Sequence, residues 1–378
     1  MKNYPELFKN LPTPCYVLDE ELLIRNLEFC KRIEEESGCK ILLAQKAFSM
    51  YAVYGLMAKY LAGAAASSLF EAKLAAEFFP GENHIYAPAY REEEFGEILS
   101  CCSHIVFNSY TQLEKFLPEI RACEKKIEYG LRINPEVSTC QNPMYDPCAA
   151  GSRFGVTAEH FDRNVKVDGI HFHTLCEQGV EDFEKTLAKV EENFGDYLRG
   201  VKWVNFGGGH FLTKEDYDME ELIRVVRKFS ETYGVQVYLE PGEAVAYNTG
   251  FLVSRVMDIV QNGVKIAVTD ASAACHMPQV LEERYRPDIL GAGAPGEYPY
   301  DYRLGGNTCL GDDVIGDYSF PQELRPGSLL VFTDMAHYTM VKNNFFNGVN
   351  LPAIAKLKPD GSVETLRTFG YEDFKSKL

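Results

Sequence analysis

Several features that would assign this chain to a whole class of proteins are missing from its sequence. No apolar stretch approaches the eighteen or so residues of a membrane span, and residues 1–5 do not begin a secretory signal peptide. The 11 cysteines include no C-x-x-C pair and lack the spacing of a zinc site or disulfide framework. A net charge of −17 argues against binding to nucleic acid or anionic membranes. We therefore expect a cytoplasmic protein with free thiols, and a cationic small molecule suits its charge.

The first two thirds of the chain alternate between short apolar runs and helical segments. At 378 residues the chain is too long for one ordinary core, so two domains are expected. Eight runs are typical of buried strands, at residues 41–44, 63–66, 84–87, 103–107, 127–133, 167–173, 203–206 and 235–240. Ser68 with Glu71 is a capping box that begins one of the intervening helices, and another helix is expected over residues 49–61. Eight such units in about 210 residues predict a (β/α)8 TIM-type barrel.

The pattern changes after Gly242. Apolar runs at 251–260, 265–269 and 328–332 are separated by glycine and proline turns with little helical periodicity, which predicts an all-β domain. A strand near residues 15–19 joins this domain from the N-terminal side. We therefore expect a barrel at residues 22–246 and a β-domain formed by residues 1–21 and 247–378.

The first strand of the predicted barrel ends on a lysine. Residues 41–44 are aliphatic, and Lys46 follows almost directly. Desolvation lowers the pKa of a lysine toward the neutral amine that condenses with an aldehyde. A lysine that emerges into solvent is the alternative. The side chains at the other strand ends decide between the two, because the working residues of a barrel lie at the C-terminal ends of its strands.

Those strand ends carry a set of chemically capable residues, namely Arg132, His173, Cys176, the triple glycine Gly207, Gly208 and Gly209, and Glu240 followed by Glu243. Glycine backbone N–H groups can approach a phosphate closely, although three glycines also suit a tight turn. Arg132 could equally form a buried ion pair. His171 and His173 share one face of their strand, and some metal-dependent barrel hydrolases hold a metal with such a pair. We expect no metal, because neither a carboxylate ligand pattern nor a further histidine stands at the expected strand ends.

A lysine, a phosphate cradle, an imidazole and a carboxylate at four strand ends converge on pyridoxal phosphate. Lys46 would hold the aldehyde carbon, the glycines the phosphate, and His173 would stack on the ring. Glu240 would keep the pyridine nitrogen protonated. A protonated ring is a strong electron sink, which suits decarboxylation better than racemisation.

Four motifs at these positions carry a family resemblance. Residues 44–46 (AQK), 171–178 (HFHTLCEQ), 205–210 (NFGGGH) and 240–243 (EPGE) are similar to those of the fold-type III pyridoxal-phosphate decarboxylases. The similarity continues through residues 309–313 and 336–348. Within that family, HTLCEQ and EPGE resemble the branch that decarboxylates carboxynorspermidine or carboxyspermidine to norspermidine or spermidine.

The resemblance implies further site residues. Cys309 matches a cysteine that reaches the site from the partner subunit of a homodimer with shared active sites, where it protonates the carbanion. Tyr338 matches a tyrosine near the phosphate, and Cys176 stands where relatives often have a phosphate-binding serine. Asp312 falls in a matching segment and is predicted to contact substrate. Gln279 stands where relatives usually carry a substrate-binding aspartate.

Glu243 is the residue on which substrate choice depends most. Ornithine, arginine and diaminopimelate decarboxylases typically have arginine there, beside the phosphate. A carboxylate at that position needs a cationic neighbour, and an amine of a polyamine is one; a solvated, outward-facing glutamate is the alternative. Diaminopimelate or basic amino-acid decarboxylation remains the alternative function. A metal-dependent hydrolase and a non-catalytic pyridoxal-phosphate carrier are more remote.

Overall fold

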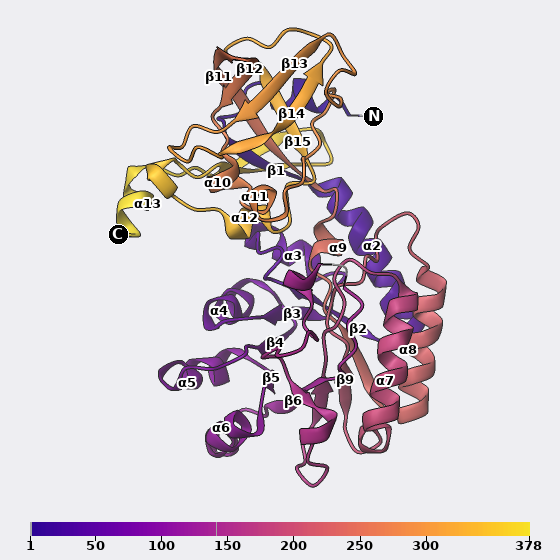
Figure 1. Cartoon of the computed structure of the whole chain (residues 1–378). Coiled ribbons are helices and arrows are strands. Elements are labelled where there is room, and N and C mark those ends of the chain that lie inside the picture. Colours follow the sequence, from indigo (N-terminus) through magenta and orange to yellow (C-terminus); the bar gives the residue numbers. More distant parts are fainter. Residues whose placement is uncertain (1, 141) are drawn as a thin grey trace. The chain divides into compact units, whose positions relative to one another are not determined.

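The computed structural model describes residues 2–140 and 142–378, and the chain divides into two compact units (Figure 1). Residues 25–245 form one unit, and residues 1–24 form the other together with residues 246–378. No helix in the described part of the chain combines the length and apolar character needed to cross a membrane.

The first unit contains a closed barrel of eight parallel strands. These strands are β2 (Lys40–Ala44), β3 (Gly63–Ala66), β4 (Glu82–Tyr86), β5 (His104–Phe107), β6 (Glu128–Asn134), β8 (Gly169–His171), β9 (Trp203–Asn205) and β10 (Gln236–Leu239). Their order is β5-β4-β3-β2-β10-β9-β8-β6, and pairing between β5 and β6 closes the circle. The short strand β7 (Val156–Thr157) pairs with β6 outside the closed circle. The structure confirms the predicted (β/α)8 TIM-type barrel.

Helices precede, connect and follow these strands, and the longer ones lie outside the barrel (Figure 1). They are α2 (Glu20–Ser37), α3 (Tyr54–Met57), α4 (Leu69–Phe78), α5 (Glu92–Cys101), α6 (Tyr110–Ala122), α7 (Val180–Leu198), α8 (Met219–Tyr233) and α9 (Glu243–Ala246). Ser68 caps α4 by accepting a hydrogen bond from the Glu71 N–H at 3.3 Å, as the capping box predicts.

Two connections differ from the simple alternation. The helix expected over residues 49–61 is a 3-10 turn, Tyr51–Val53, followed by the single turn of α3. Gly55 stands in this segment and lowers its helix propensity. Between β6 and β8, the described residues contain two 3-10 turns (Pro143–Tyr145 and Ala158–His160) and β7, with no α-helix.

Small residues inside the barrel make room for its one tryptophan. A Cβ atom on Gly169 would lie 2.0 Å from the Trp203 ring, and a Cβ on Gly130 would lie 2.4 Å from it. Trp203 is 1% exposed and packs with Leu42 and Tyr238. The glycines are therefore required by close packing on neighbouring strands β6, β8 and β9.

The second unit is built on a mixed, mostly antiparallel sheet. Its strands are β1 (Cys15–Asp19), β11 (Gly250–Asn262), β12 (Val264–Thr269), β13 (Tyr300–Gly305), β14 (Val314–Phe320), β15 (Leu329–Thr333), β16 (Ala353–Leu357) and β17 (Val363–Arg367). The order is β14-β13-β12-β11-β1-β16-β17, and β15 pairs with β11. Short helices accompany the sheet: α1 (Tyr4–Phe8), α10 (Ala273–His276), α11 (Gln279–Glu283), α12 (Thr339–Lys342), the 3-10 turn Phe346–Gly348 and α13 (Tyr371–Ser376).

Strand β1 ties the N-terminal segment into this sheet. It pairs antiparallel with β11 and parallel with β16, so a strand from the start of the chain lies between two from its far end. All five of its residues are buried, and Tyr16 and Val17 pack into two different apolar clusters of the unit. The predicted contribution of an N-terminal strand to the β-rich part is confirmed.

Candidate active site

Lys46 stands two residues beyond the end of β2. The strand before it is fully buried at Ile41, Leu42 and Leu43, which fixes where the lysine leaves the barrel wall. The Lys46 side chain is itself exposed, but surrounding protein still lowers the pKa of its amine. Desolvation of the amine by the protein around it is the main cause; attraction to Glu240 opposes it and repulsion from Arg132 adds to it. The neutral, nucleophilic amine is thereby favoured.

Glu240 follows β10 and is held in a polar environment inside the barrel. Its Oε1 accepts a hydrogen bond from Asn205 Nδ2 at 2.7 Å, and its Oε2 lies 3.6 Å from His171 Nε2. Burial by itself would raise the pKa of this carboxyl. The interactions with His171 and Asn205 outweigh burial and lower the pKa to about 2, so Glu240 is ionised across the physiological range.

His173 lies two residues beyond β8 and faces the glycine loop. Its Nδ1 accepts a hydrogen bond from the Gly208 N–H at 2.9 Å, so a neutral ring carries its proton on Nε2. Burial holds the pKa of His173 well below its ordinary value, and repulsion from Lys46 and Arg132 acts in the same direction. A neutral ring of fixed orientation is suited to stacking against an aromatic cofactor.

The triple glycine is less open to an anion than its sequence indicates. The N–H of Gly207 donates to Asn205 Oδ1 at 2.8 Å, and that of Gly208 is taken by His173. Gly209 has a φ of +88°, and its N–H meets no acceptor among the residues described by the structure. Of the three predicted amides, Gly209 therefore remains available for a phosphate.

Arg132, near the end of β6, is 4% exposed and lies over two aromatic rings. Its guanidinium carbon is 4.5 Å from the centroid of Tyr86 and 4.6 Å from that of Phe154, and Nη2 donates to the His173 carbonyl at 3.2 Å. Its neighbours are aromatic rings and a carbonyl group. Among the described residues, Arg132 therefore has no ion-pair partner. A cation stacked in this way keeps donors for an anionic ligand.

Asn108, just beyond β5, fixes the segment that supplies Phe154. Its Oδ1 accepts from the Tyr86 hydroxyl and from the Gly155 N–H, both at 2.7 Å, and its Nδ2 donates to the Arg153 carbonyl at 2.8 Å. Sequence reasoning overlooked Tyr86, Phe154 and Asn108. A tyrosine at the C-terminal end of a predicted strand was the available signal for Tyr86.

Cys176 and Glu243 stand at the same edge of the barrel. The Cys176 N–H donates to Gln178 Oε1 at 3.3 Å, and Gln178 Nε2 donates to the Thr139 carbonyl at 2.8 Å, which anchors this loop. The Cys176 thiol is close enough to Lys46 to act on the pKa of its amine. Glu243 is the first residue of α9 and is partly exposed.

The second unit, which contains the large sheet, carries the predicted site residues Cys309, Tyr338 and Gln279. Cys309 is exposed, and its N–H donates to Asn347 Oδ1 at 2.7 Å. Tyr338 adopts a φ of +55° directly before α12. Gln279 begins α11, and its Nε2 donates to Glu283 Oε1 at 2.5 Å.

The two neighbouring aspartates of the Cys309 loop have different environments. Asp312 is exposed and pairs with Arg284 at 2.6 Å. Asp313 is 5% exposed and accepts hydrogen bonds from the hydroxyls of Ser272 (2.8 Å) and Thr308 (2.6 Å). Asp313 therefore anchors the loop, whereas Asp312 is an exposed carboxylate whose contact with substrate stays a prediction.

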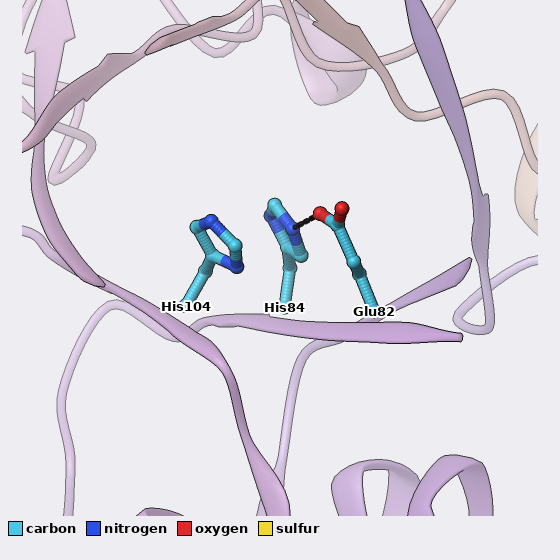
Figure 2. A group of neighbouring side chains, drawn as sticks. All are labelled: Glu82, His84 and His104. Atoms are coloured by element: carbon cyan, nitrogen blue, oxygen red, sulfur yellow. Dashed lines mark hydrogen bonds and ion pairs between the residues drawn. The ribbon is translucent and has the colours of Figure 1, made fainter. Parts of the chain in front are cut away.

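A second polar cluster lies at the opposite, N-terminal ends of the barrel strands, where Glu82, His84 and His104 approach one another (Figure 2). Glu82 accepts from His84 Nε2 at 3.1 Å and from the Tyr238 hydroxyl at 2.9 Å, and it pairs with Lys40. Burial raises the pKa of Glu82, but the bonds from His84 and Lys40 outweigh it and lower the pKa overall.

The geometry of this cluster suits a hydrogen-bonded ion pair better than a metal site. The rings of His84 and His104 stack with centroids 3.9 Å apart and an angle of 15° between their planes. Imidazole lone pairs lie in the ring plane, so two stacked rings do not converge on one ion. The ammonium of Lys40 at the same carboxylate also opposes a cation.

Comparison with known proteins finds relatives that match nearly the whole chain. Residues 15–336 match the family model described as pyridoxal-dependent decarboxylase, C-terminal sheet domain. A carboxyaminopropylagmatine decarboxylase from Synechocystis is 43% identical, over 98% of this chain and 96% of that protein. A carboxynorspermidine/carboxyspermidine decarboxylase from Campylobacter jejuni is 42% identical, over 97% and 98%.

Solved structures agree with the sequence comparison. The crystal structure of a carboxynorspermidine decarboxylase from Campylobacter jejuni, complexed with norspermidine, superimposes with a TM-score of 0.91 at 41% identity and covers 97% of this chain and all of that one. Diaminopimelate decarboxylases are more distant, as shown by the enzyme from Archaeoglobus fulgidus, which is 25% identical over 91% of this chain and 87% of that protein.

Proposed function

The chain belongs to the pyridoxal-dependent decarboxylases, and from that premise we propose that it decarboxylates a carboxylated polyamine, carboxynorspermidine or carboxyspermidine, to norspermidine or spermidine. Identities of 41–43% along nearly the whole chain to decarboxylases of this substrate class carry the proposal. These relatives extend over both units, so the similarity is not limited to a shared barrel.

The residues at the C-terminal end of the barrel fit pyridoxal phosphate. Lys46 supplies an amine whose pKa is lowered, and Glu240 supplies an ionised carboxylate. His173 offers a neutral ring, while Arg132 and the Gly209 N–H offer donors for the anionic groups of the cofactor. Each chemical feature of the cofactor thus has a counterpart among these side chains.

The bound cofactor supplies an electron sink for the pair of electrons left when carbon dioxide departs. In the proposed mechanism, Lys46 would hold the aldehyde carbon of the cofactor, and Glu240 would keep its ring nitrogen protonated. His173 would stack against the ring. The cofactor's anionic groups would be bound by Arg132, Cys176, the glycine loop and Tyr338. A proton would be returned to the α-carbon by Cys309 of a second subunit or by Lys46.

Three polar residues are proposed to recognise the substrate. Glu243 would hold a distal ammonium group, with contributions from Gln279 and Asp312. Glutamine at position 279 can donate to an amine nitrogen or accept from an ammonium but provides no charge, so the negative charge must come from the carboxylates.

A carboxylated aminopropylagmatine is a second candidate substrate, favoured by the 43% identity to the Synechocystis enzyme. It shares the carboxylated aminopropyl arm with the two polyamines but ends in a guanidinium group instead of an ammonium group. A planar guanidinium forms bidentate bonds to a carboxylate, so Glu243 could serve either end group.

The other functions considered from the sequence are less well supported. Diaminopimelate decarboxylation corresponds to the more distant relatives. Membership of the decarboxylase family replaces the hypothesis of a metal-dependent hydrolase that uses His171 and His173. The same membership makes a non-catalytic carrier an unnecessary assumption.

We further propose a cytoplasmic homodimer that shares its active sites, with a barrel domain at residues 22–246. The exposure of Cys309 supports the assembly, because a proton donor for a neighbouring subunit must be accessible. Mixing Lys46→Ala with Cys309→Ala tests it when Cys309, and not Lys46, returns the proton, because each variant is then inactive alone. Exchange of subunits should restore about a quarter of the normal activity, since half of the random pairs contain one intact site. No recovery after complete exchange would contradict shared sites.

The cofactor assignment is tested by the visible absorption of the purified protein and its change on borohydride treatment. We expect a yellow protein that bleaches on reduction and carries the pyridoxyl label on Lys46 in a peptide map. A label on another lysine, or a protein that fails to take up added pyridoxal phosphate, would overturn the proposed site.

Substrate choice is then tested by carbon dioxide release from the two carboxylated polyamines, carboxyaminopropylagmatine and meso-diaminopimelate under identical conditions. We expect kcat/KM for at least one carboxylated polyamine to exceed that for diaminopimelate about a thousandfold. Preference for the guanidinium substrate would select the second candidate, and preference for diaminopimelate would refute both.

A further inference from the structure

One buried amide side chain contacts two separate parts of the candidate site. Asn205, at the end of β9, is fully buried. Its Oδ1 accepts from the Gly207 N–H at 2.8 Å, and its Nδ2 donates to Glu240 Oε1 at 2.7 Å. Reversing the amide would set its NH2 group against another N–H, so both hydrogen bonds fix a single orientation.

The Asn205 bond is the one hydrogen bond to the Glu240 carboxylate in the part of the chain that the structure describes. His171 comes near the other oxygen at 3.6 Å, which is longer than a hydrogen bond. Neither ring nitrogen of His171 has a hydrogen-bond partner among the described residues. Asn205 therefore supplies the hydrogen bond that fixes the position of the carboxylate, and His171 contributes charge at longer range.

We propose that Asn205 is a positioning residue that couples the glycine loop to Glu240, so that the cofactor's phosphate loop and the carboxylate at its ring nitrogen are held in one fixed relation. This inference rests on the proposed role of Glu240. Asn205 acts through these two groups and needs no contact with the substrate. Strand pairing supports the coupling, because β9 lies directly beside β10, the strand that Glu240 directly follows.

Replacing Asn205 with aspartate separates the two hydrogen bonds. Aspartate retains an oxygen that accepts from Gly207. A protonated aspartic acid donates to Glu240 much as the amide does, but an ionised one repels it. Two carboxyls at hydrogen-bond distance share one proton, and the pair loses that proton at a raised pH.

The variant Asn205→Asp should therefore acquire a pH dependence that the parent protein lacks. The other charged or titratable groups that act on Glu240 are His171, His84, Lys46 and Arg132, and all of them stay unchanged in the variant. We expect its dissociation constant for pyridoxal phosphate to rise about tenfold between pH 6 and pH 8.5, with a parallel change in the absorption of the bound cofactor. A dissociation constant and spectrum that follow the parent protein across this range would overturn the proposal.

The double variant Asn205→Asp/Glu240→Gln provides the matched control. The aspartate introduced at position 205 can accept from both the Gly207 N–H and the new amide at position 240. Both hydrogen bonds are therefore kept, and the negative charge moves from position 240 to position 205. The new pH dependence should disappear, and any loss of folded protein in the single variant should be rescued. Failure of this rescue would also count against the coupling.

Glu240→Gln alone distinguishes this inference from the proposed function. If Glu240→Gln leaves the cofactor spectrum unchanged, the role of Glu240 is wrong and the coupling falls with it. If Glu240→Gln alters the spectrum but Asn205→Asp does not, the decarboxylase site stands and the coupling alone is refuted.

Discussion

The two ends of the barrel contain similar polar residues but differ in how far these residues pair with one another. At the N-terminal ends of the strands, Glu82 is bonded to His84 (Figure 2), and it is also bonded to Lys40 and Tyr238. At the C-terminal ends, Lys46 forms no ion pair with any residue that the structure describes, and Glu240 has one hydrogen bond. A lysine, histidines and a glutamate are present at both ends.

The difference lies in what these groups leave available. Mutual pairing at the N-terminal end satisfies the carboxylate and stabilises the barrel, and it leaves little for chemistry. At the other end, burial lowers the pKa of His173, and repulsion from Arg132 and from the protonated form of Lys46 acts in the same direction. Separation of groups that could have neutralised each other is typical of a functional site.

The largest predicted effect compares the two lysines. Lys46→Ala should lower kcat by at least roughly a thousandfold, because no other amine replaces the group that carries the cofactor. Lys40→Ala is the matched control at the other end. It removes a partly exposed ion pair and should cost about 1 kcal/mol in the free energy of unfolding while activity is retained. A large loss of kcat in Lys40→Ala would abolish the distinction between the ends.

The next comparison uses the two glutamates. Glu240→Gln should lower kcat about a hundredfold, because an amide cannot carry the charge that keeps the ring nitrogen protonated. Glu82→Gln should affect stability instead, by about 2 kcal/mol, since it leaves Lys40 and His84 without their carboxylate. Steady-state kinetics and thermal unfolding of both variants provide the measurement. Equal effects of the two changes on kcat would contradict this division of roles.

A smaller effect is predicted for Glu243, which belongs to substrate choice. Glu243→Gln should raise KM for the carboxylated polyamine about tenfold with little change in the cofactor spectrum, because it removes a charge opposite an ammonium group. Glu177→Gln, an exposed change in the neighbouring loop after β8, is the control. An unchanged KM in Glu243→Gln would leave this residue as a solvated surface glutamate.

The smallest effect on activity is expected for a change that alters the pH dependence of stability at the N-terminal end. Burial, with repulsion from His84, lowers the pKa of His104 to about 3, so between that pH and 6.5 the unfolded chain binds the proton more readily. This contribution to stability is complete above pH 6.5 and is lost as the pH falls toward 3. His104→Gln should reduce the slope of unfolding free energy against pH by about 1.4 kcal/mol per unit in this window. Urea unfolding of both proteins at pH 4.5 and pH 6 gives these slopes. If the parent protein and His104→Gln change equally in free energy of unfolding between the two pH values, the prediction is wrong.

The sequence was most informative where local pattern and chemistry coincide. The apolar run 41–44 followed by Lys46 predicted a buried strand with a lysine beyond it, and the structure agrees. The capping box at Ser68 likewise predicted the start of α4. Both depend on neighbouring residues, so no long-range contact was needed to infer them.

The hydrogen bonding of the glycine loop could not be inferred in the same way. Three glycines predict a phosphate cradle, but Asn205 and His173 already accept the N–H groups of Gly207 and Gly208. Those acceptors come from positions up to 35 residues away. The contrast between exposed Asp312 and buried Asp313 depends equally on distant partners in the sheet unit.

The sequence by itself determined the class of the protein: the alternation of strands and helices, the lysine after the first barrel strand and the residue types at the strand ends. These properties follow from the periodicity and the chemistry of neighbouring residues. The tertiary structure alone decided which polar groups satisfy each other, as Glu82 and Lys40 do, and which remain available, as Lys46 does. Which groups pair depends on the register of strands distant in sequence. Hydrogen bonds and ion pairs form only over a few tenths of a nanometre, and register decides which groups come that close.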